Sequence, residues 1–182
     1  MEISENIRHI LDPSAEWKLY KNRSYRAGIQ TADKDSIYNV PDRPGVVYNF
    51  LEESYENVAE NGYVITGILG EMWPVGAATL KKYDVRPEDI TDTTVYVNTV
   101  ELDTVYAAVM IPKDVQFTLR TDYGEKALLN GNRPGIDHHE GDYIVVAAKL
   151  VNSVYVPDTD DCGRIVNGAV FSRLYKPYDA EI

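Results

Sequence analysis

The chain has few of the residues that build disulfides and metal centres. It contains one cysteine, three histidines and three phenylalanines in 182 residues. The lone Cys162 excludes an internal disulfide and a cysteine-based metal site. It stands in "DTDDCGR", where the neighbouring carboxylates disfavour a reactive thiolate. We therefore expect Cys162 to be a loop residue rather than a nucleophile.

Long apolar runs and an excess of basic residues are missing as well. No segment approaches the roughly 18–20 apolar residues of a membrane helix, and the acidic start "MEISENIRHILD" lacks the apolar centre of a signal peptide. Lysine and arginine number 18 against 29 acidic residues, which gives a net charge of −11. Because phosphate contacts need cations, this charge predicts that the protein does not bind nucleic acid. The missing apolar runs and signal peptide predict a cytoplasmic protein that does not bind a membrane.

Tyrosine dominates the aromatic residues, with 14 copies. This residue is favoured at half-buried strand positions and at binding surfaces. Segments dense in valine, threonine and tyrosine, such as "TTVYVNTVELDTVYAAVMIP" and "GDYIVVAAKLVNSVYVP", predict many short strands. The fold class expected from this pattern is mainly β, built as small barrels or sandwiches.

The order of loops and apolar segments predicts two tandem modules. An N-capping serine, a short apolar stripe and a proline predict a short helix within residues 1–16. A first barrel-like or sandwich-like β module is expected over residues 17–85, and a second over residues 94–182. The polar, proline-containing residues 86–93 are expected to connect them.

Two short blocks recur in the same order in both predicted modules. "ENGYVIT" around Tyr63 is similar to "EGDYIVV" around Tyr143, and "GAATLKKY" is similar to "GAVFSRLY". The last residues of the second pair, Tyr83 and Tyr175, each lie seven residues after the glycine. The sequence therefore predicts an internal repeat in which the recurring residues belong to the scaffold.

The stretch "ENGYVITGILGEMWPVGAATLKKY" resembles the signature of a small phage-associated module of the PGDYG type. The resemblance covers about 25 residues, and the second module matches it only at "EGDY", Phe171 and Tyr175. It implies a viral or prophage origin rather than a particular chemistry. The matching residues of the first module are Gly62, Tyr63, Gly67, Gly70, Glu71, Trp73, Pro74 and Tyr83.

The "GEMWP" part of this stretch, which does not recur, is the first candidate site. Trp73 would stack on a flat ring while the carboxylate of Glu71 accepts hydrogen bonds from a ligand. The alternative, which we favour from the sequence, is a hairpin with Trp73 in the core and Glu71 in solvent.

The stretch "RPGIDHHEGDY" holds the densest group of reactive side chains. His138, His139 and Glu140 suggest a hydrolase, with or without a metal ion. Adjacent histidines in a strand point to opposite faces, however, so the two imidazoles do not share one ion. A polar turn before a strand is the favoured interpretation, and the metal is left unknown.

The leading functional hypothesis is a non-enzymatic accessory binding protein of phage or prophage type. It would act in counter-defence, by sequestering a small nucleotide-like ligand or by blocking a host protein. Arg120, Arg133, His138 and His139 join Glu71 and Trp73 as candidate ligand-binding residues. The alternatives are the hydrolase described above and a virion or assembly protein that self-associates through strand edges. No phosphate loop or dinucleotide motif is present, so no cofactor is predicted.

Overall fold

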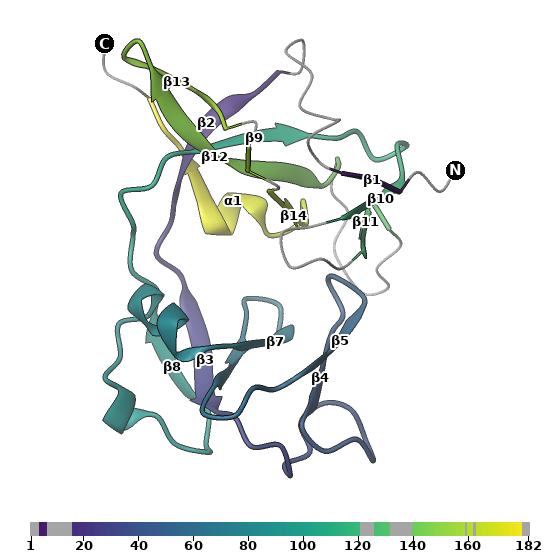
Figure 1. Cartoon of the computed structure of the whole chain (residues 1–182), viewed down its shortest axis with the longest axis vertical. Coiled ribbons are helices and arrows are strands. Elements are labelled where there is room, and N and C mark those ends of the chain that lie inside the picture. Colours follow the sequence, from purple (N-terminus) through teal and green to yellow (C-terminus); the bar gives the residue numbers. More distant parts are fainter. Residues whose placement is uncertain are drawn as a thin grey trace. The chain divides into compact units, whose positions relative to one another are not determined.

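The protein is mainly β, as expected, and its strands form several small sheets (Figure 1). The computed structural model describes residues 4–6, 16–120, 126–131, 140–158, 160–161 and 163–179. Helical structure in this part of the chain is confined to the short helix α1 and two 3-10 helices, η2 and η3. Their bounds are Phe171–Leu174 for α1, Ala77–Lys82 for η2 and Pro87–Asp89 for η3.

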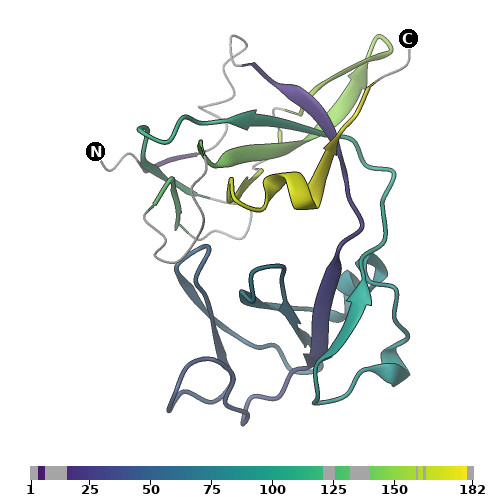
Figure 2. The same cartoon turned by 180° about the vertical axis from the view of Figure 1, so that it is seen from behind.

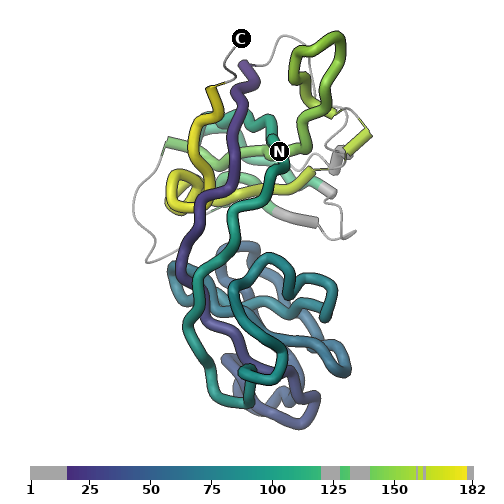
Figure 3. Tube along the Cα trace, turned by 90° about the vertical axis from the view of Figure 1, so that its left-hand side faces the viewer, coloured from purple at the N-terminus to yellow at the C-terminus, as the bar shows by residue number. Residues whose placement is uncertain are grey.

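The chain forms two compact units and crosses between them twice. The central unit comprises Arg23–Glu101, and the terminal unit combines Met1–Asn22 with Leu102–Ile182. The two crossings can be followed in Figure 3 as the purple and the teal traces. This division differs from the predicted modules 17–85 and 94–182.

Two exchanged strands explain the difference. β2 (Lys18–Asn22) pairs with β9 (Tyr106–Met110), and β8 (Val95–Asn98) pairs with β3 (Arg26–Thr31). The first strand of each predicted module therefore completes the other unit. Residues 86–93, expected as a connection, hold η3 and lie inside the central unit.

The terminal unit is built on a sheet in the order β13-β12-β9-β2-β15, with β14 also paired to β12. One face carries Ala108, Val145 and Val166, which pack against Phe171 of α1, and Figure 2 shows α1 lying across this face. The strands not yet bounded are β12 (Tyr143–Val151), β13 (Val154–Pro157), β14 (Arg164–Val166) and β15 (Tyr175–Pro177).

The opposite face of this sheet is covered by a second sheet, so the unit is sandwich-like. Val109 and Ile144 pack there against Leu119 and Leu129, which are fully buried. The covering sheet has the order β1-β10-β11, with bounds Ser4–Asn6, Phe117–Arg120 and Lys126–Leu129.

The predicted N-terminal helix is not what the described residues form. Ser4, expected as the N-cap, lies in β1, which pairs in parallel with β10 through Ser4 and Thr118. Residues 7–15 of the expected helix lie outside the described residues. Pairing with an open strand edge satisfies the backbone groups at residues 4–6 and overrides a weak local helix signal.

The central unit has a four-stranded sheet in the order β7-β6-β3-β8 and a separate β4–β5 hairpin. Its core contains Ala27, Ile29, Ile65, Tyr83 and Ile90, all of them buried. Alternate residues of β3 and β6 supply this core, because successive side chains of a strand point to opposite faces. The remaining bounds are β4 (Val46–Asn49), β5 (Ser54–Asn57), β6 (Tyr63–Thr66) and β7 (Met72–Val75).

The sheets of the two units pair in the same register around the recurring tyrosines. Tyr63 and Tyr143 each begin a strand that pairs with the middle strand of its sheet. Tyr83 and Tyr175 each follow a helical turn, and they pair with Thr99 at the end of β8 and with Asn22 at the end of β2. The matching pairs are Tyr63–Thr31 and Tyr143–Met110, Val95–Ile29 and Lys18–Ala108, and Tyr83–Thr99 and Tyr175–Asn22.

A buried carboxylate ties three segments of the terminal unit together. Asp142 is 3 % exposed and accepts the backbone N–H groups of Asn130 at 2.8 Å and of Gly168 at 2.9 Å. The Asn130 side-chain oxygen accepts the N–H of Asp142 at 2.7 Å. Position 141 requires glycine, because a Cβ there would collide with the carbonyl oxygen of Ile111. The "GDY" motif is therefore structural.

The Asn130 amide completes this network. Its Nδ2 donates to the carbonyl oxygens of Ile111, Pro112 and Val115, at 3.1, 2.9 and 2.8 Å. Its backbone is left-handed, with φ of 54°, a conformation that asparagine tolerates better than most residues. One side chain thus fixes the turn that follows β9.

We predict that Asn130→Asp lowers the free energy of unfolding of the terminal unit by about 3 kcal/mol. The change preserves shape but points a carboxylate oxygen at three carbonyl oxygens. Asn152→Asp is the matched control, because Asn152 is exposed and has a φ of 51°. Urea unfolding should show an effect within about 0.5 kcal/mol for this control, and equal losses in the two variants would contradict the assignment.

Candidate functional site

The structure describes some of the candidate ligand-binding residues and not others. The side chains of Glu71 and Trp73 are described and lie close together. Arg120 is described by its backbone alone, in β10. Arg133, His138 and His139 lie outside the described residues. Within the described ranges, no group of three or more histidine, cysteine or acidic side chains is arranged to hold a metal ion.

Glu71 and Trp73 belong to the hairpin that joins β6 to β7. The Gly67 N–H donates to the carbonyl of Glu71 at 2.8 Å, and Gly70 adopts a φ of +86° that glycine accommodates without strain. Ile65 pairs with Trp73 across the two arms. Pro74 lies inside β7, which is an edge strand that tolerates proline.

The favoured interpretation of this hairpin is correct for Trp73 and wrong for Glu71. Trp73 packs against the core of the central unit. Glu71 is only 7 % exposed, and its carboxylate accepts the Leu69 N–H at 2.9 Å. The carboxylate turns inward because the loop supplies a donor for it. A Cβ on Gly67 would meet this carboxylate and would lie 2.7 Å from Cζ3 of Trp73.

We predict that Gly67→Ala displaces the Glu71 carboxylate and lowers the free energy of unfolding by about 1–3 kcal/mol. The fluorescence of Trp73, read in a Trp17→Phe background, should shift toward the emission of an exposed indole. Gly76→Ala is the control, because a Cβ on Gly76 meets nothing within 4 Å. Unchanged emission in Gly67→Ala would show that the hairpin absorbs the methyl group.

A groove of about 570 Å³ lies elsewhere in the central unit, beside β8. Val95 and Val97 project into it from β8, and the segment from Tyr83 to Asp89 forms its other wall. Its lining combines apolar and ionised side chains: Tyr83, Asp84, Val85, Arg86, Asp89, Val95, Val97 and Val100. None of these residues was a candidate ligand-binding residue from the sequence. Arg86 and Asp89 belong to residues 86–93, which were expected to form a polar connection.

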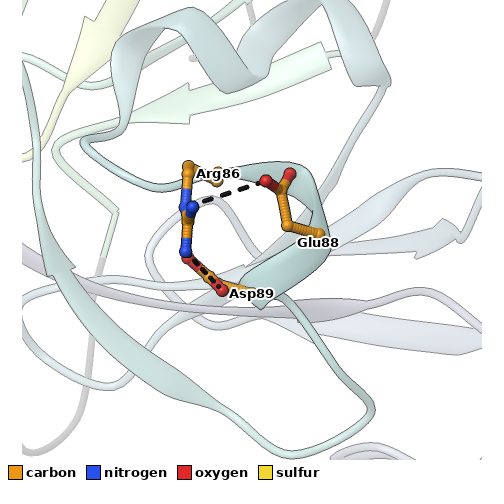
Figure 4. A network of polar contacts seen from close by, with 3 residues as sticks. All are labelled: Arg86, Glu88 and Asp89. Carbon is orange, nitrogen blue, oxygen red and sulfur yellow. Dashed lines mark hydrogen bonds and ion pairs between the residues drawn. The ribbon is translucent and has the colours of Figure 1, made fainter.

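The charged rim of the groove is organised by Arg86 (Figure 4). Its Nε and second terminal nitrogen donate to the two carboxylate oxygens of Asp89, at 2.9 and 3.3 Å. Glu88 lies 3.8 Å from the Arg86 Nε. The hydrogen bond and the charge of Asp89 raise the pKa of Arg86. With Asp84 also on the rim, carboxylates outnumber the single guanidinium.

Tyr83 forms part of the groove's lining. It is 6 % exposed. Burial raises the pKa of its hydroxyl, and Tyr25 raises it further through its charge and a side-chain hydrogen bond. Because the folded-state pKa lies above the unfolded value of about 10, keeping Tyr83 protonated stabilises the fold below that pH. This stabilisation is lost progressively as the pH rises above 10.

We predict that Tyr83→Phe destabilises the central unit by about 1 kcal/mol at neutral pH, because the bond to Tyr25 is lost. The difference from the parent protein should shrink as the pH rises from about 10 toward 12. Urea midpoints measured across this range provide the test. Tyr96→Phe alters a tyrosine that is 55 % exposed and should follow the parent curve. A difference between parent and Tyr83→Phe that stays constant with pH would refute the role of the buried hydroxyl.

The guanidinium of Arg164 in the terminal unit lies beside two aromatic rings, and this arrangement was not predicted from the sequence either. The guanidinium carbon of Arg164 lies 5.0 Å from the ring centre of Tyr106 and 6.0 Å from that of Tyr175. Such cation–π contacts stabilise a partly buried charge. Arg164 lies opposite Val145 in β12, as Trp73 lies opposite Ile65 in β6. We read it as a packing residue that fills the position an indole fills in the central unit.

The described residues include no helix long and apolar enough to cross a membrane. Comparison with protein-family models, with curated proteins and with solved structures found no match to this chain. The groove beside β8 and the buried hairpin of Glu71 and Trp73 are therefore interpreted from their own geometry.

Proposed function

We propose that the protein is a non-enzymatic binding protein of phage or prophage type that blocks a host protein. The groove beside β8 carries this proposal. It combines four valines with an ionised rim inside a single unit, the mixture of apolar centre and polar border found in protein-binding surfaces. The resemblance of residues 60–83 to a phage-associated module supports the origin.

The charge of the rim favours a protein over a nucleotide-like ligand. Arg86 is already engaged by Asp89 and lies near Glu88, so its guanidinium is partly neutralised. Asp84 adds a further carboxylate. A phosphate entering the groove would meet repulsion, whereas a lysine or arginine side chain would be attracted.

We also infer that the chain contains a duplicated module whose first strands are exchanged. The support is the shared register of the two sheets around Tyr63 and Tyr143 and around Tyr83 and Tyr175. In each unit one strand comes from the other predicted module: β8 in the central unit and β2 in the terminal one. Duplication would leave two copies, and the groove beside β8 belongs to the central one.

The proposed function is tested by affinity capture from a bacterial lysate with a matched pair of variants. Val100→Lys places a charge in the groove at a valine that is 42 % exposed. Val151→Lys makes the same change at a valine of the terminal unit that is 44 % exposed. Proteins retained by the parent should be lost with Val100→Lys and kept with Val151→Lys.

Two outcomes would contradict this proposal. If both variants retain the same proteins as the parent, the groove is not the binding surface. If the parent retains no protein above a blank column, the blocking role itself is wrong.

A further inference from the structure

The outer edge of β8 is paired over only part of its length. Tyr83 forms a bridge with Thr99, and the Asp84 N–H donates to the Asn98 carbonyl at 2.9 Å. The chain then bends away, with the Val85 N–H bonded to the Tyr83 carbonyl at 3.0 Å, and continues into η3. No described strand accompanies β8 beyond Asn98 on this side.

Tyr96 presents its backbone groups to this open edge. In an antiparallel strand, alternate residues direct both N–H and C=O to the same side. Because the Asn98 carbonyl bonds outward to Asp84, the groups of Tyr96 also point outward, away from β3. No described residue forms a hydrogen bond with them. A strand edge of this kind is a template for another extended segment.

In the terminal unit the equivalent edge, that of β2, is paired with β15. There β15 pairs with β2 from Tyr175–Asn22 to Pro177–Tyr20, and the Tyr178 N–H reaches the Leu19 carbonyl at 3.0 Å. Counted from the tyrosines that begin each pairing, Leu19 corresponds to Tyr96. The same backbone position is therefore bonded in one unit and open in the other.

The groove lies along this open edge and indicates the chemistry of the missing segment. Val95 and Val97 offer apolar contacts on the core side of β8, and Asp84 and Asp89 lie on the rim. An extended segment that alternates apolar and basic residues would place apolar side chains on the valines. Its cations would be attracted by the carboxylates, the combination by which added strands gain affinity and specificity.

We propose that the β8 edge binds an extended, basic segment of a partner protein, which adds a strand in the position that β15 occupies on β2. This inference rests on the proposed function and specifies the mode of recognition. The added strand runs antiparallel to β8, and its backbone N–H donates to the Tyr96 carbonyl. Its residues facing the groove are apolar, and the residues between them are lysine or arginine.

The test uses the full chain and a synthetic, capped peptide of alternating lysine and valine. Amide chemical shifts of the ¹⁵N-labelled protein should change at Tyr96 and its strand neighbours when the peptide is added. The lysines of the bound peptide lie opposite Tyr96 and direct their N–H groups toward β8, because the valines lie opposite Val95 and Val97 and direct theirs to solvent. Methylating the lysine backbone nitrogens should therefore weaken binding at least about tenfold, the loss expected from one or two hydrogen bonds. Methylating the valine nitrogens should not.

Two further comparisons separate backbone recognition from charge. A glutamate–valine peptide should bind at least about tenfold more weakly than the lysine–valine peptide. Tyr96→Pro removes the outward N–H without touching the bonds to β3, whereas Tyr96→Thr keeps it, so only the proline variant should lose affinity. If the proline variant does not fold, the methylated peptides still decide the question on the parent protein.

Several outcomes would overturn the inference. Equal affinity of the two methylated peptides, shift changes away from β8, or no binding at millimolar peptide would each exclude strand addition at this edge. Sedimentation velocity of the protein alone adds one more: self-association that Tyr96→Pro abolishes would assign the edge to a second copy of the chain. If captured proteins depend on Val100 but strand addition fails, the proposed function stands without this mode of recognition.

Discussion

Backbone pairing of the two exchanged strands, β2 and β8, is the constraint on which the rest of the structure depends. Each sheet is completed by a strand that the sequence places in the other module, β2 beside β9 and β8 beside β3. Both strands are short, so each needs a neighbouring strand to satisfy its N–H and C=O groups. Once these partners are fixed, the crossing points and the open edge of β8 follow.

The pairing of the strand edges also distinguishes the scaffold from the candidate site beside β8. Where the chain after a recurring tyrosine continues along its neighbour, as from Tyr175 to Tyr178, the edge is filled. Where it bends away after Asp84, a groove remains, and no described residue forms a hydrogen bond with the outward backbone groups of Tyr96. The buried carboxylates of Glu71 and Asp142 belong to the scaffold, because each accepts backbone N–H groups and fixes a loop.

Much of the fold could be predicted from local patterns, and the candidate site could not. Segments dense in valine, threonine and tyrosine located β8, β9 and β12, and the "GEMWP" part was expected in a hairpin, which β6 and β7 form. The burial of Glu71 was missed because it depends on a donor, the Leu69 N–H, that only the closed loop brings into reach. The groove was missed because Arg86 and Asp89 occur in a segment whose composition is that of a linker.

The sequence by itself determined the β class, the strand positions around Tyr63 and Tyr143, and the acidic surface, since these depend on side-chain periodicity and composition. Tertiary structure decided which strand pairs with which, because backbone hydrogen bonds are the same for every residue type and carry no sequence signature. It therefore also decided that β8, rather than β2, keeps an open edge. The proposed binding surface exists only because of that choice.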